Sequence, residues 1–347
     1  MGGTRQGERT FSGGSAYFLS RMGGDMRTRR CPGVLLAVSA AVVLVTACAT
    51  TGPRPAAEAH TAIDPLVTTE WLSRHLAEED LVVLDCTVHV AMSSDGGVRV
   101  ESGRVGYERG HIAGAGFADL TGDLAEVALG QAAHFKFALP TPERFAAAMG
   151  ALGVGDGSRV VLYSATRPDW AARVWWMLRW IGFDRVALLD GGLQAWTAEG
   201  RPLSTEAFAR PAARLTVSLR PEVIADRDEV RAALGKGSVS IIDAMPEASF
   251  QGKFSLYARP GHIPGAANIP SSALVDESGR FLAREALAAL HGDVRPGRVI
   301  TYCGGGIAAS SNAFVMTRLG FDDVAVYIGS LDEWAADPAN PMETGTP

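Results

Sequence analysis

Short apolar segments alternate with longer mixed segments along most of the chain. Four of the apolar segments are short runs of four residues, at 81–84, 160–163, 186–189 and 299–302, in which Thr301 is the one residue that is not apolar. Runs of this length and composition are typical of strands buried on both faces of a parallel sheet. Segments 171–181 and 309–319, which follow two of these runs, have the pattern of helices. The alternation predicts βαβ units and therefore an α/β fold.

The chain also repeats itself. Two motifs occur twice in the same order: Gly110-His111-Ile112 recurs as Gly261-His262-Ile263, and Ile181–Val186 recurs as Leu319–Val324. Asp85, at the end of one apolar run, corresponds to Asp243 in the second copy. The copies lie about 140–150 residues apart, which is far too long for a solenoid repeat and fits two tandem domains. Each domain should be a small parallel sheet with helices on both faces.

The repeat and the composition between its copies predict the domain boundaries. The expected segments are a signal at 1–47, a Pro- and Ala-rich tether at 48–62, an N-terminal domain at 63–200, a linker at 201–222 and a C-terminal domain at 223–347. The linker assignment rests on three prolines in that segment.

The N-terminal segment has the pattern of a targeting signal. Arg27, Arg29 and Arg30 precede the apolar run Val34–Ala47, and Val45-Thr46-Ala47-Cys48 resembles the bacterial lipobox. The 14 residues of the run are fewer than the roughly 20 that a membrane-spanning helix needs. We therefore expect an exported protein of the cell envelope, lipidated on Cys48 and held at a membrane. A plain cleaved signal, a membrane-spanning segment and a twin-arginine signal are the alternatives.

Charge and cysteine usage narrow the functional classes. Residues 1–47 hold six arginines and two acidic residues, so the chain that follows would carry a net charge of −10 instead of −6. An acidic body argues against nucleic-acid binding. The four cysteines form no Cys-x-x-Cys motif and the seven histidines are scattered, so we expect no metal site. Cys86 follows a buried-strand pattern and is expected to be structural.

Cys303 is the strongest candidate for chemistry. It ends the apolar run Val299–Tyr302 and precedes Gly304-Gly305-Gly306-Ile307-Ala308 and the helical segment Ala309–Leu319. Backbone N–H groups of a glycine-rich turn and a helix N-terminus can converge on such a thiol and lower its pKa. A buried structural cysteine is the alternative, but it would need no glycine-rich loop. The sequence therefore predicts a nucleophile.

The first copy of the repeat lacks this loop. Ser164 occupies the position of Cys303, and Ala165-Thr166-Arg167 follows it without a glycine. A serine without a neighbouring base is a poor nucleophile, so the N-terminal domain should be catalytically silent.

Together these features resemble the tandem rhodanese-domain sulfurtransferases. The resemblance extends from about Trp71 to Glu343 and includes the two Gly-His-Ile motifs, Arg173–Leu178, Leu189–Trp196 and the Cys303 loop. It implies transfer of a sulfane sulfur from thiosulfate or 3-mercaptopyruvate to cyanide or a thiol, through a persulfide on Cys303. It implies no cofactor, and small-molecule donors and acceptors as partners.

The resemblance also implies roles for other residues. Gly304, Gly305, Gly306, Ile307, Ala308 and Ala309 would form the anion-binding loop around the sulfur. Arg259, just before the second Gly-His-Ile motif, would bind the anionic end of the donor, with a surface or structural arginine as the alternative. The family often has an arginine directly after the Asp-Ala that ends the first strand of the active domain. Met245 stands there instead, so the sequence leaves the choice of donor open.

Three further residues are expected to support the site. Asp243 would bond within the loop beside it. His111 would lie near the cleft between the domains and could shuttle a proton, although a structural role for His111 and His262 is favoured because both occur in the repeated motif.

Two other functions were weighed. Phosphatases of this fold use a Cys-x5-Arg loop, but Ala309 stands at the arginine position, which excludes that chemistry. A non-catalytic lipoprotein that carries or binds sulfane sulfur remains the alternative, because Met245 replaces the family arginine.

Overall fold

The computed structural model describes residues 63–92, 98–126 and 137–345, and it contains two similar α/β halves. Each half has a five-stranded parallel sheet. In the first half the strands are β1 (Leu66–Val67), β2 (Leu81–Asp85), β5 (Gly116–Phe117), β6 (Arg159–Tyr163) and β7 (Val186–Leu189). In the second they are β8 (Ile224–Ala225), β9 (Val239–Asp243), β10 (Ala267–Asn268), β11 (Arg298–Tyr302) and β12 (Val324–Tyr327).

The two sheets have the same strand order. It is β1-β7-β6-β2-β5 in the first half and β8-β12-β11-β9-β10 in the second. The register matches as well, because Asp85 pairs with Tyr163 as Asp243 pairs with Tyr302. The expected α/β fold with two tandem parallel-sheet domains is thus confirmed. The expected signal, tether and Cys48 lie outside the described residues.

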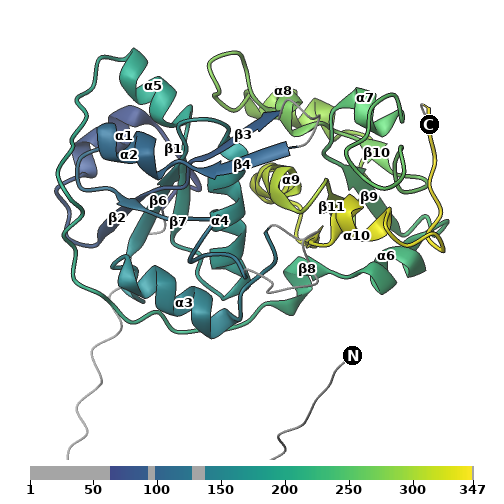
Figure 1. Ribbon diagram of the computed structural model, residues 1–347, viewed down its shortest axis with the longest axis horizontal. Coiled ribbons are helices and arrows are strands. Elements are labelled where there is room, and N and C mark those ends of the chain that lie inside the picture. Colours follow the sequence, from purple (N-terminus) through teal and green to yellow (C-terminus); the bar gives the residue numbers. More distant parts are fainter. Residues whose placement is uncertain (1–62, 93–97, 127–136, 346–347) are drawn as a thin grey trace, which may run out of the picture. The chain divides into compact units, whose positions relative to one another are not determined.

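Five helices accompany each sheet (Figure 1). Those of the first half are α1 (Thr69–His75), α2 (Arg104–Arg109), α3 (Pro142–Ala151), α4 (Pro168–Trp180) and α5 (Gly192–Ala198). Those of the second are α6 (Arg227–Ala233), α7 (Glu247–Phe250), α8 (Arg284–Leu290), α9 (Ile307–Leu319) and α10 (Ser330–Trp334). None of the helices in the described part of the chain is long and apolar enough to span a membrane.

The helices after the central strands begin earlier than the sequence pattern predicts. Helix α4 begins at Pro168, because proline fits the first turn, where its missing N–H has no helical partner. Helix α9 begins at Ile307, because Gly306 before it adopts a left-handed conformation (φ 78°) that turns the chain into the helix. The site-forming loop of the second half is therefore shorter than expected.

Side chains alternate between two faces of each sheet, and one face of each contributes to a common core. Val82 and Leu84 of β2 face this core together with Ile242 and Val299 of the second sheet. Helices α4 and α9 lie between the sheets, where the Trp175 and Phe314 rings meet edge to face at 5.1 Å. Such a pair adds about 0.5–1.5 kcal/mol to the burial of its apolar area. The halves are therefore joined by a continuous apolar core.

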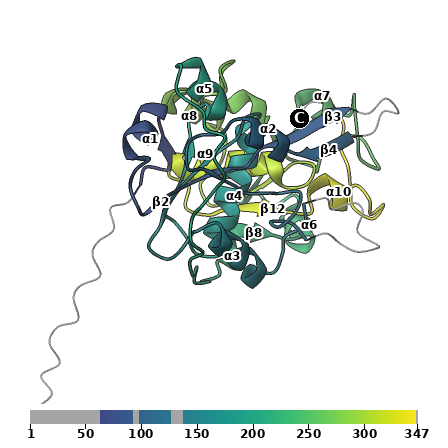
Figure 2. The ribbon, with the colours of Figure 1, turned by 60° about the vertical axis from the view of Figure 1, so that its left-hand side comes forward.

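An antiparallel hairpin interrupts the similarity of the halves. Strands β3 (Val88–Met92) and β4 (Val98–Ser102) pair with each other beside the first sheet. In both views the hairpin extends away from that sheet toward elements of the second half (Figures 1 and 2). It forms one wall of the cavity described below.

The segment expected as the linker packs against the first half. Residues 205–220 form no helix or strand. The backbone N–H of Ala213 donates to the Gly150 carbonyl and that of Ser218 to the Ile181 carbonyl, both at 2.9 Å. The exact domain boundaries stay a prediction.

Candidate active site

Cys303 lies between the end of β11 and the start of α9, and its side chain is buried. Its backbone N–H donates to the hydroxyl of Ser330 at 3.1 Å. Ser330 is itself buried and has a positive φ of 49°, which is rare outside glycine. Its hydroxyl donates to the Tyr327 carbonyl at 2.7 Å. A strained serine thus anchors the backbone of the candidate nucleophile.

The loop after Cys303 supplies hydrogen bonds to its sulfur. The backbone N–H groups of Gly305, Gly306 and Ala309 donate to the thiol sulfur and favour its anionic form. Burial acts in the opposite direction and is the stronger effect, so the pKa of Cys303 is raised. The expected lowering of this pKa is therefore wrong: the sequence reveals the donors but not the depth of burial.

The three glycines differ in how much space surrounds them. A methyl group on Gly304 would overlap the phenol oxygen of Tyr257, and one on Gly306 would lie 2.9 Å from a guanidinium nitrogen of Arg173. At Gly305 the nearest atom would be a carboxylate oxygen of Asp332 at 3.5 Å, an ordinary contact. Gly304 and Gly306 are therefore required for close packing, whereas Gly305 is not.

Cys303 lines a cavity of about 1000 Å³ between the halves. Apolar side chains from both halves line it, including Val90 of the hairpin, Trp170 of α4, Met245 and Tyr257. The loop residues Gly304, Gly305, Ile307 and Ala308 line it too. The expected nucleophile and its loop therefore face a space that can hold a small substrate.

Arg167 is the one arginine among the described residues that line this cavity. It comes from the first half, directly before α4, and its side chain is about half exposed. Its Nε donates to Asp169 at 2.6 Å, and Nη2 donates to the hydroxyl of Ser271 in the second half at 2.8 Å. His89, Asp169 and Asp332 are the other ionisable side chains of the lining, apart from Cys303 and Tyr257.

Asp243 lies at the end of β9, beside the site, as expected. It is fully buried, and one carboxylate oxygen accepts the backbone N–H of Met245 at 2.7 Å. The other oxygen has no hydrogen-bond partner. Burial raises the pKa of Asp243 to about 7. Its counterpart Asp85 accepts both the N–H and the hydroxyl of Thr87, which occupies the position of Met245.

The structure does not place Arg259 at the cavity. The guanidinium of Arg259 donates to backbone carbonyls between α10 and the C-terminal segment: those of Trp334, Ala335, Asp337 and Asn340, at 2.7–3.2 Å. Its expected role as the donor clamp does not fit this arrangement. Arg259 binds the backbone of the C-terminal segment, which fits the alternative expectation of a structural arginine.

The two repeated histidines also lie away from the cavity lining. His111 donates through Nδ1 to the Tyr107 carbonyl at 2.8 Å, and His262 donates to the Phe250 carbonyl at 2.7 Å. Each ring stacks on the aromatic ring of the residue that it bonds. The geometry matches the structural role that the repeat favoured, and His111 is not part of the cleft.

The first copy offers no comparable nucleophile. Ser164 lies next to Thr166, with 3.1 Å between their hydroxyl oxygens, and does not line the cavity. Cys86 is buried and burial raises its pKa well above the usual value, as expected for a structural thiol. Within the described ranges, no group of His, Cys, Asp and Glu is arranged to hold a metal ion.

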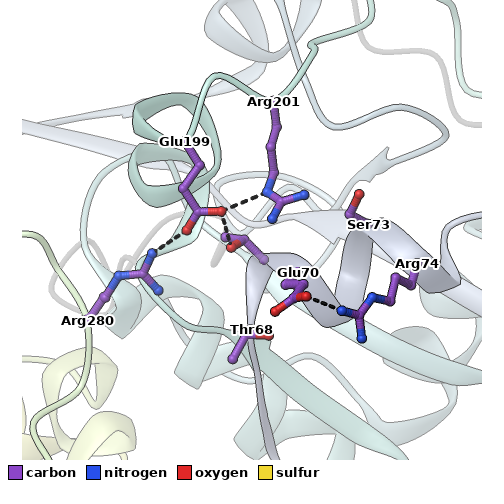
Figure 3. A pocket seen from close by; sticks show the side chains of 8 residues that line it. Thr68, Glu70, Ser73, Arg74, Glu199, Arg201 and Arg280 are labelled. Carbon is purple, nitrogen blue, oxygen red and sulfur yellow. Dashed lines mark hydrogen bonds and ion pairs between the residues drawn. The ribbon is translucent and has the colours of Figure 1, made fainter.

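A second cavity of about 610 Å³ lies elsewhere, between α1, the end of α5 and Arg280 (Figure 3). Its centre is Glu199, which accepts hydrogen bonds from Thr69, Arg201 and Arg280 at 2.6–2.8 Å. These bonds lower the pKa of Glu199 to about 2. Glu199 thus connects Thr69 of the first half with Arg280 of the second.

Sequence reasoning missed Ser330, Tyr257 and Arg167, all of which contact or face the Cys303 loop. None of them belongs to a motif with a recognisable spacing. Only Arg167 could have been found from the sequence, because it lies three residues after Ser164, which occupies the position of Cys303 in the first copy.

The chain was compared with known proteins. The family model described as "Rhodanese-like domain" matches residues 68–199 and 226–337. A relative from Pseudomonas aeruginosa, named "Probable 3-mercaptopyruvate sulfurtransferase", is 37% identical over 289 residues, covering 81% of this chain and 98% of the relative. "Thiosulfate/3-mercaptopyruvate sulfurtransferase 2" of Arabidopsis thaliana is 31% identical over 309 residues, covering 80% of this chain and 86% of the relative.

A solved structure agrees with these sequence matches. The crystal structure of a 3-mercaptopyruvate sulfurtransferase from Escherichia coli superposes with a TM-score of 0.67 at 30% identity. The match covers 77% of this chain and 99% of that protein. The similarity therefore includes both halves.

Proposed function

This chain belongs to the rhodanese family and is a sulfurtransferase, and we propose that Cys303 carries the transferred sulfur as a persulfide between a small anionic donor and a thiophilic acceptor. The observation that carries this proposal is the convergence of the Gly305, Gly306 and Ala309 N–H groups on the Cys303 sulfur at a cavity. These donors are fixed before the reaction begins, so they stabilise a sulfur anion without reorganisation.

The reaction proceeds in two displacements. The Cys303 thiolate attacks the sulfur of the donor, an S–S bond forms, and the bond between that sulfur and the rest of the donor breaks. With 3-mercaptopyruvate the electron pair leaves on carbon, and protonation gives pyruvate; with thiosulfate, sulfite leaves. A thiolate or cyanide acceptor then attacks the outer sulfur and restores the Cys303 thiolate.

The cavity favours 3-mercaptopyruvate as the donor. Its lining is largely apolar, and its one arginine, Arg167, already bonds to Asp169. Met245 lines the cavity at the position where the family resemblance implied an arginine. A singly charged keto acid needs less positive charge than the thiosulfate dianion. Its carboxylate would bind the guanidinium of Arg167, whose planar donors suit a carboxylate.

Intact-mass measurement tests the proposal. The purified protein is incubated separately with 3-mercaptopyruvate and with thiosulfate, and excess donor is removed. We expect a mass increase of one sulfur atom, larger in yield with 3-mercaptopyruvate and lost in Cys303→Ser. Cys86→Ser is the matched control, because that thiol is also buried but does not line the cavity, and it should keep the adduct. No adduct with either donor would instead support a non-catalytic sulfur-binding protein.

The cellular location forms part of the same proposal. The basic residues, the apolar run and Cys48 support a lipoprotein held at a membrane of the cell envelope, with the two domains in an exported compartment. Cys48→Ala should abolish incorporation of a labelled fatty acid and release the protein from the membrane fraction. Retention of the label in that variant would exclude Cys48 as the lipidated residue.

A further inference from the structure

Arg173 is a buried cation close to the active-site loop, although it belongs to the catalytically silent half. It lies on α4 and its side chain is almost fully buried. Its Nη1 donates to the Gly306 carbonyl at 3.3 Å, and Nη2 donates to the Phe137 carbonyl at 2.9 Å. The guanidinium carbon also lies 5.1 Å from the centre of the Trp176 ring. Arg173 therefore connects the silent half to the loop that holds the sulfur.

The guanidinium of Arg173 bonds to backbone carbonyls and not to a carboxylate. Among the described residues no carboxylate forms an ion pair with it. Burial lowers the pKa of Arg173 to about 10, and the charge of Cys303 opposes that shift. Even at that value the guanidinium stays protonated near neutral pH. A buried charge without a partner costs several kcal/mol, so its retention calls for a compensating anion.

Apart from Arg167 and His89 of the cavity lining, the other ionisable side chains described near Cys303 are acidic. They are Asp243 on β9, Tyr302 on β11, Tyr257 before the second Gly-His-Ile motif and Asp332 on α10. A negative charge on Asp243 raises the pKa of Cys303, and the thiolate in turn raises that of Tyr257. The N–H groups of the loop offset part of this unfavourable environment, but they carry only partial charges. Arg173 is the full positive charge that faces the thiolate from α4.

We propose that Arg173 is a positioning residue for sulfur transfer, which fixes the loop through the Gly306 carbonyl and offsets the negative charge on the sulfur of Cys303. This inference rests on the proposed function. It assigns the silent half an active part: the second half holds the nucleophile and the loop, and the first half supplies the counter-charge. The catalytic half is electrostatically incomplete by itself.

The charge of Arg173 should act on both forms of the sulfur. The thiolate must exist before it can attack the donor, and the persulfide anion must persist until the acceptor arrives. A cation in a buried site interacts more strongly than it would in water, because the surroundings screen it less. Loss of that charge should raise the pKa of the thiol by about one unit or more, and each unit lowers the thiolate fraction at neutral pH about tenfold.

The test measures the Cys303 pKa directly, without any sulfur donor. The alkylation rate of Cys303 by iodoacetamide is followed by peptide mass analysis across pH in the wild type, Arg173→Met and Arg173→Lys. We expect the apparent pKa to rise by about one unit or more in Arg173→Met, and to rise less in Arg173→Lys, which keeps the charge. Donor turnover at pH 7 should fall about tenfold in Arg173→Met and recover in part at higher pH.

The matched control is Arg179→Met on the same helix. Arg179 also lies against a tryptophan, with 5.0 Å from its guanidinium carbon to the Trp175 ring, but unlike Arg173 it forms an ion pair with a carboxylate, that of Asp184. This variant should leave the alkylation pKa unchanged. Arg173→Gln removes the same charge with a polar side chain, and it decides the question if the methionine variant does not fold.

An unchanged alkylation pKa in a folded neutral variant would overturn the inference. Equal shifts in Arg173→Met and Arg179→Met would do the same, because they would indicate a general loosening of α4. Absence of a persulfide in the wild type would reject the proposed function, whereas the alkylation pKa would still report on Arg173. The two failures are therefore distinguishable.

Discussion

The hydroxyl of Ser311 on α9 donates to the carboxylate of Asp169 on α4 at 2.6 Å, and both side chains are buried. The other oxygen of Asp169 accepts Nε of Arg167, which lines the active-site cavity. A hydrogen bond in the interface between the halves therefore also holds the side chain proposed to bind the donor.

Ser311→Ala should destabilise the protein by about 1–3 kcal/mol, because it leaves a buried carboxylate oxygen without its partner. It should also raise the KM for 3-mercaptopyruvate moderately, since Arg167 loses part of its support. Urea unfolding and steady-state kinetics measure the two effects. Thr317→Ala is the control on the same helix, because that hydroxyl bonds only to the Ala313 carbonyl of its own helix. Equal effects in both variants would contradict the role of the Ser311–Asp169 bond.

The three glycines after Cys303 should respond differently to alanine. Gly304→Ala would push away the Tyr257 phenol, and Gly306→Ala would face Arg173 from a left-handed conformation, so both should lose turnover by about tenfold or more. Gly305→Ala has room and should retain most of the activity. Donor turnover in the three variants, each checked for folding, tests this order. Comparable losses at all three positions would argue against steric fit as the reason for the glycines.

The two arginines considered as donor clamps should give opposite results. Arg167→Ala should raise the KM for 3-mercaptopyruvate about tenfold or more while the melting temperature changes little, because its guanidinium is partly exposed at the cavity. Arg259→Ala should lower the melting temperature clearly and leave the donor KM near its wild-type value in the folded fraction, since its bonds go to backbone carbonyls. A raised donor KM in a stable Arg259→Ala protein would restore the sequence-based expectation.

Asp243 should make stability depend on pH. Its pKa is about 7 in the folded protein against 3.8 for an ordinary aspartate. A raised carboxyl pKa means that its stabilising contribution is complete below about pH 4 and is lost as the pH rises through about 7. The loss should reach about 4 kcal/mol at most, given about 1.4 kcal/mol per pKa unit. Asp243→Asn should remove this dependence.

Urea unfolding of the wild type and Asp243→Asn at several pH values between 4 and 8 measures the difference. The wild type should lose stability relative to the variant as the pH rises from about 4 to 7, so the two curves should separate toward higher pH. Asp156→Asn is the control with the opposite sign, because hydrogen bonds from Thr216 lower the pKa of that exposed carboxylate. Parallel curves for the wild type and Asp243→Asn would show that Asp243 has an ordinary pKa.

The sequence predicts the fold well because its signals are local. The middle strand of each sheet, β6 or β11, is largely apolar. The repeated Gly-His-Ile motif marks corresponding loops in the two halves. Cys303 and its glycines could be recognised for the same reason: strand, thiol, loop and helix are consecutive in the chain.

The site residues that the sequence did not reveal lie far from Cys303 in the chain. Arg167 and Arg173 lie more than 100 residues before Cys303 and reach the cavity and its loop only because α4 packs on α9. Arg259 was predicted as the donor clamp from its place before a motif, but proximity to a motif says nothing about where a side chain points. The pKa of Cys303 was misjudged because burial depends on how the two halves meet.

The shared core between the sheets has a consequence for how the protein folds. Trp175 and Phe314 belong to different copies of the repeat, yet each completes the packing of the other. Removing either half would expose a large aromatic surface that now has no contact with water. The duplication is therefore visible in the sequence and in the topology, but because the core is shared we expect the two halves to unfold together.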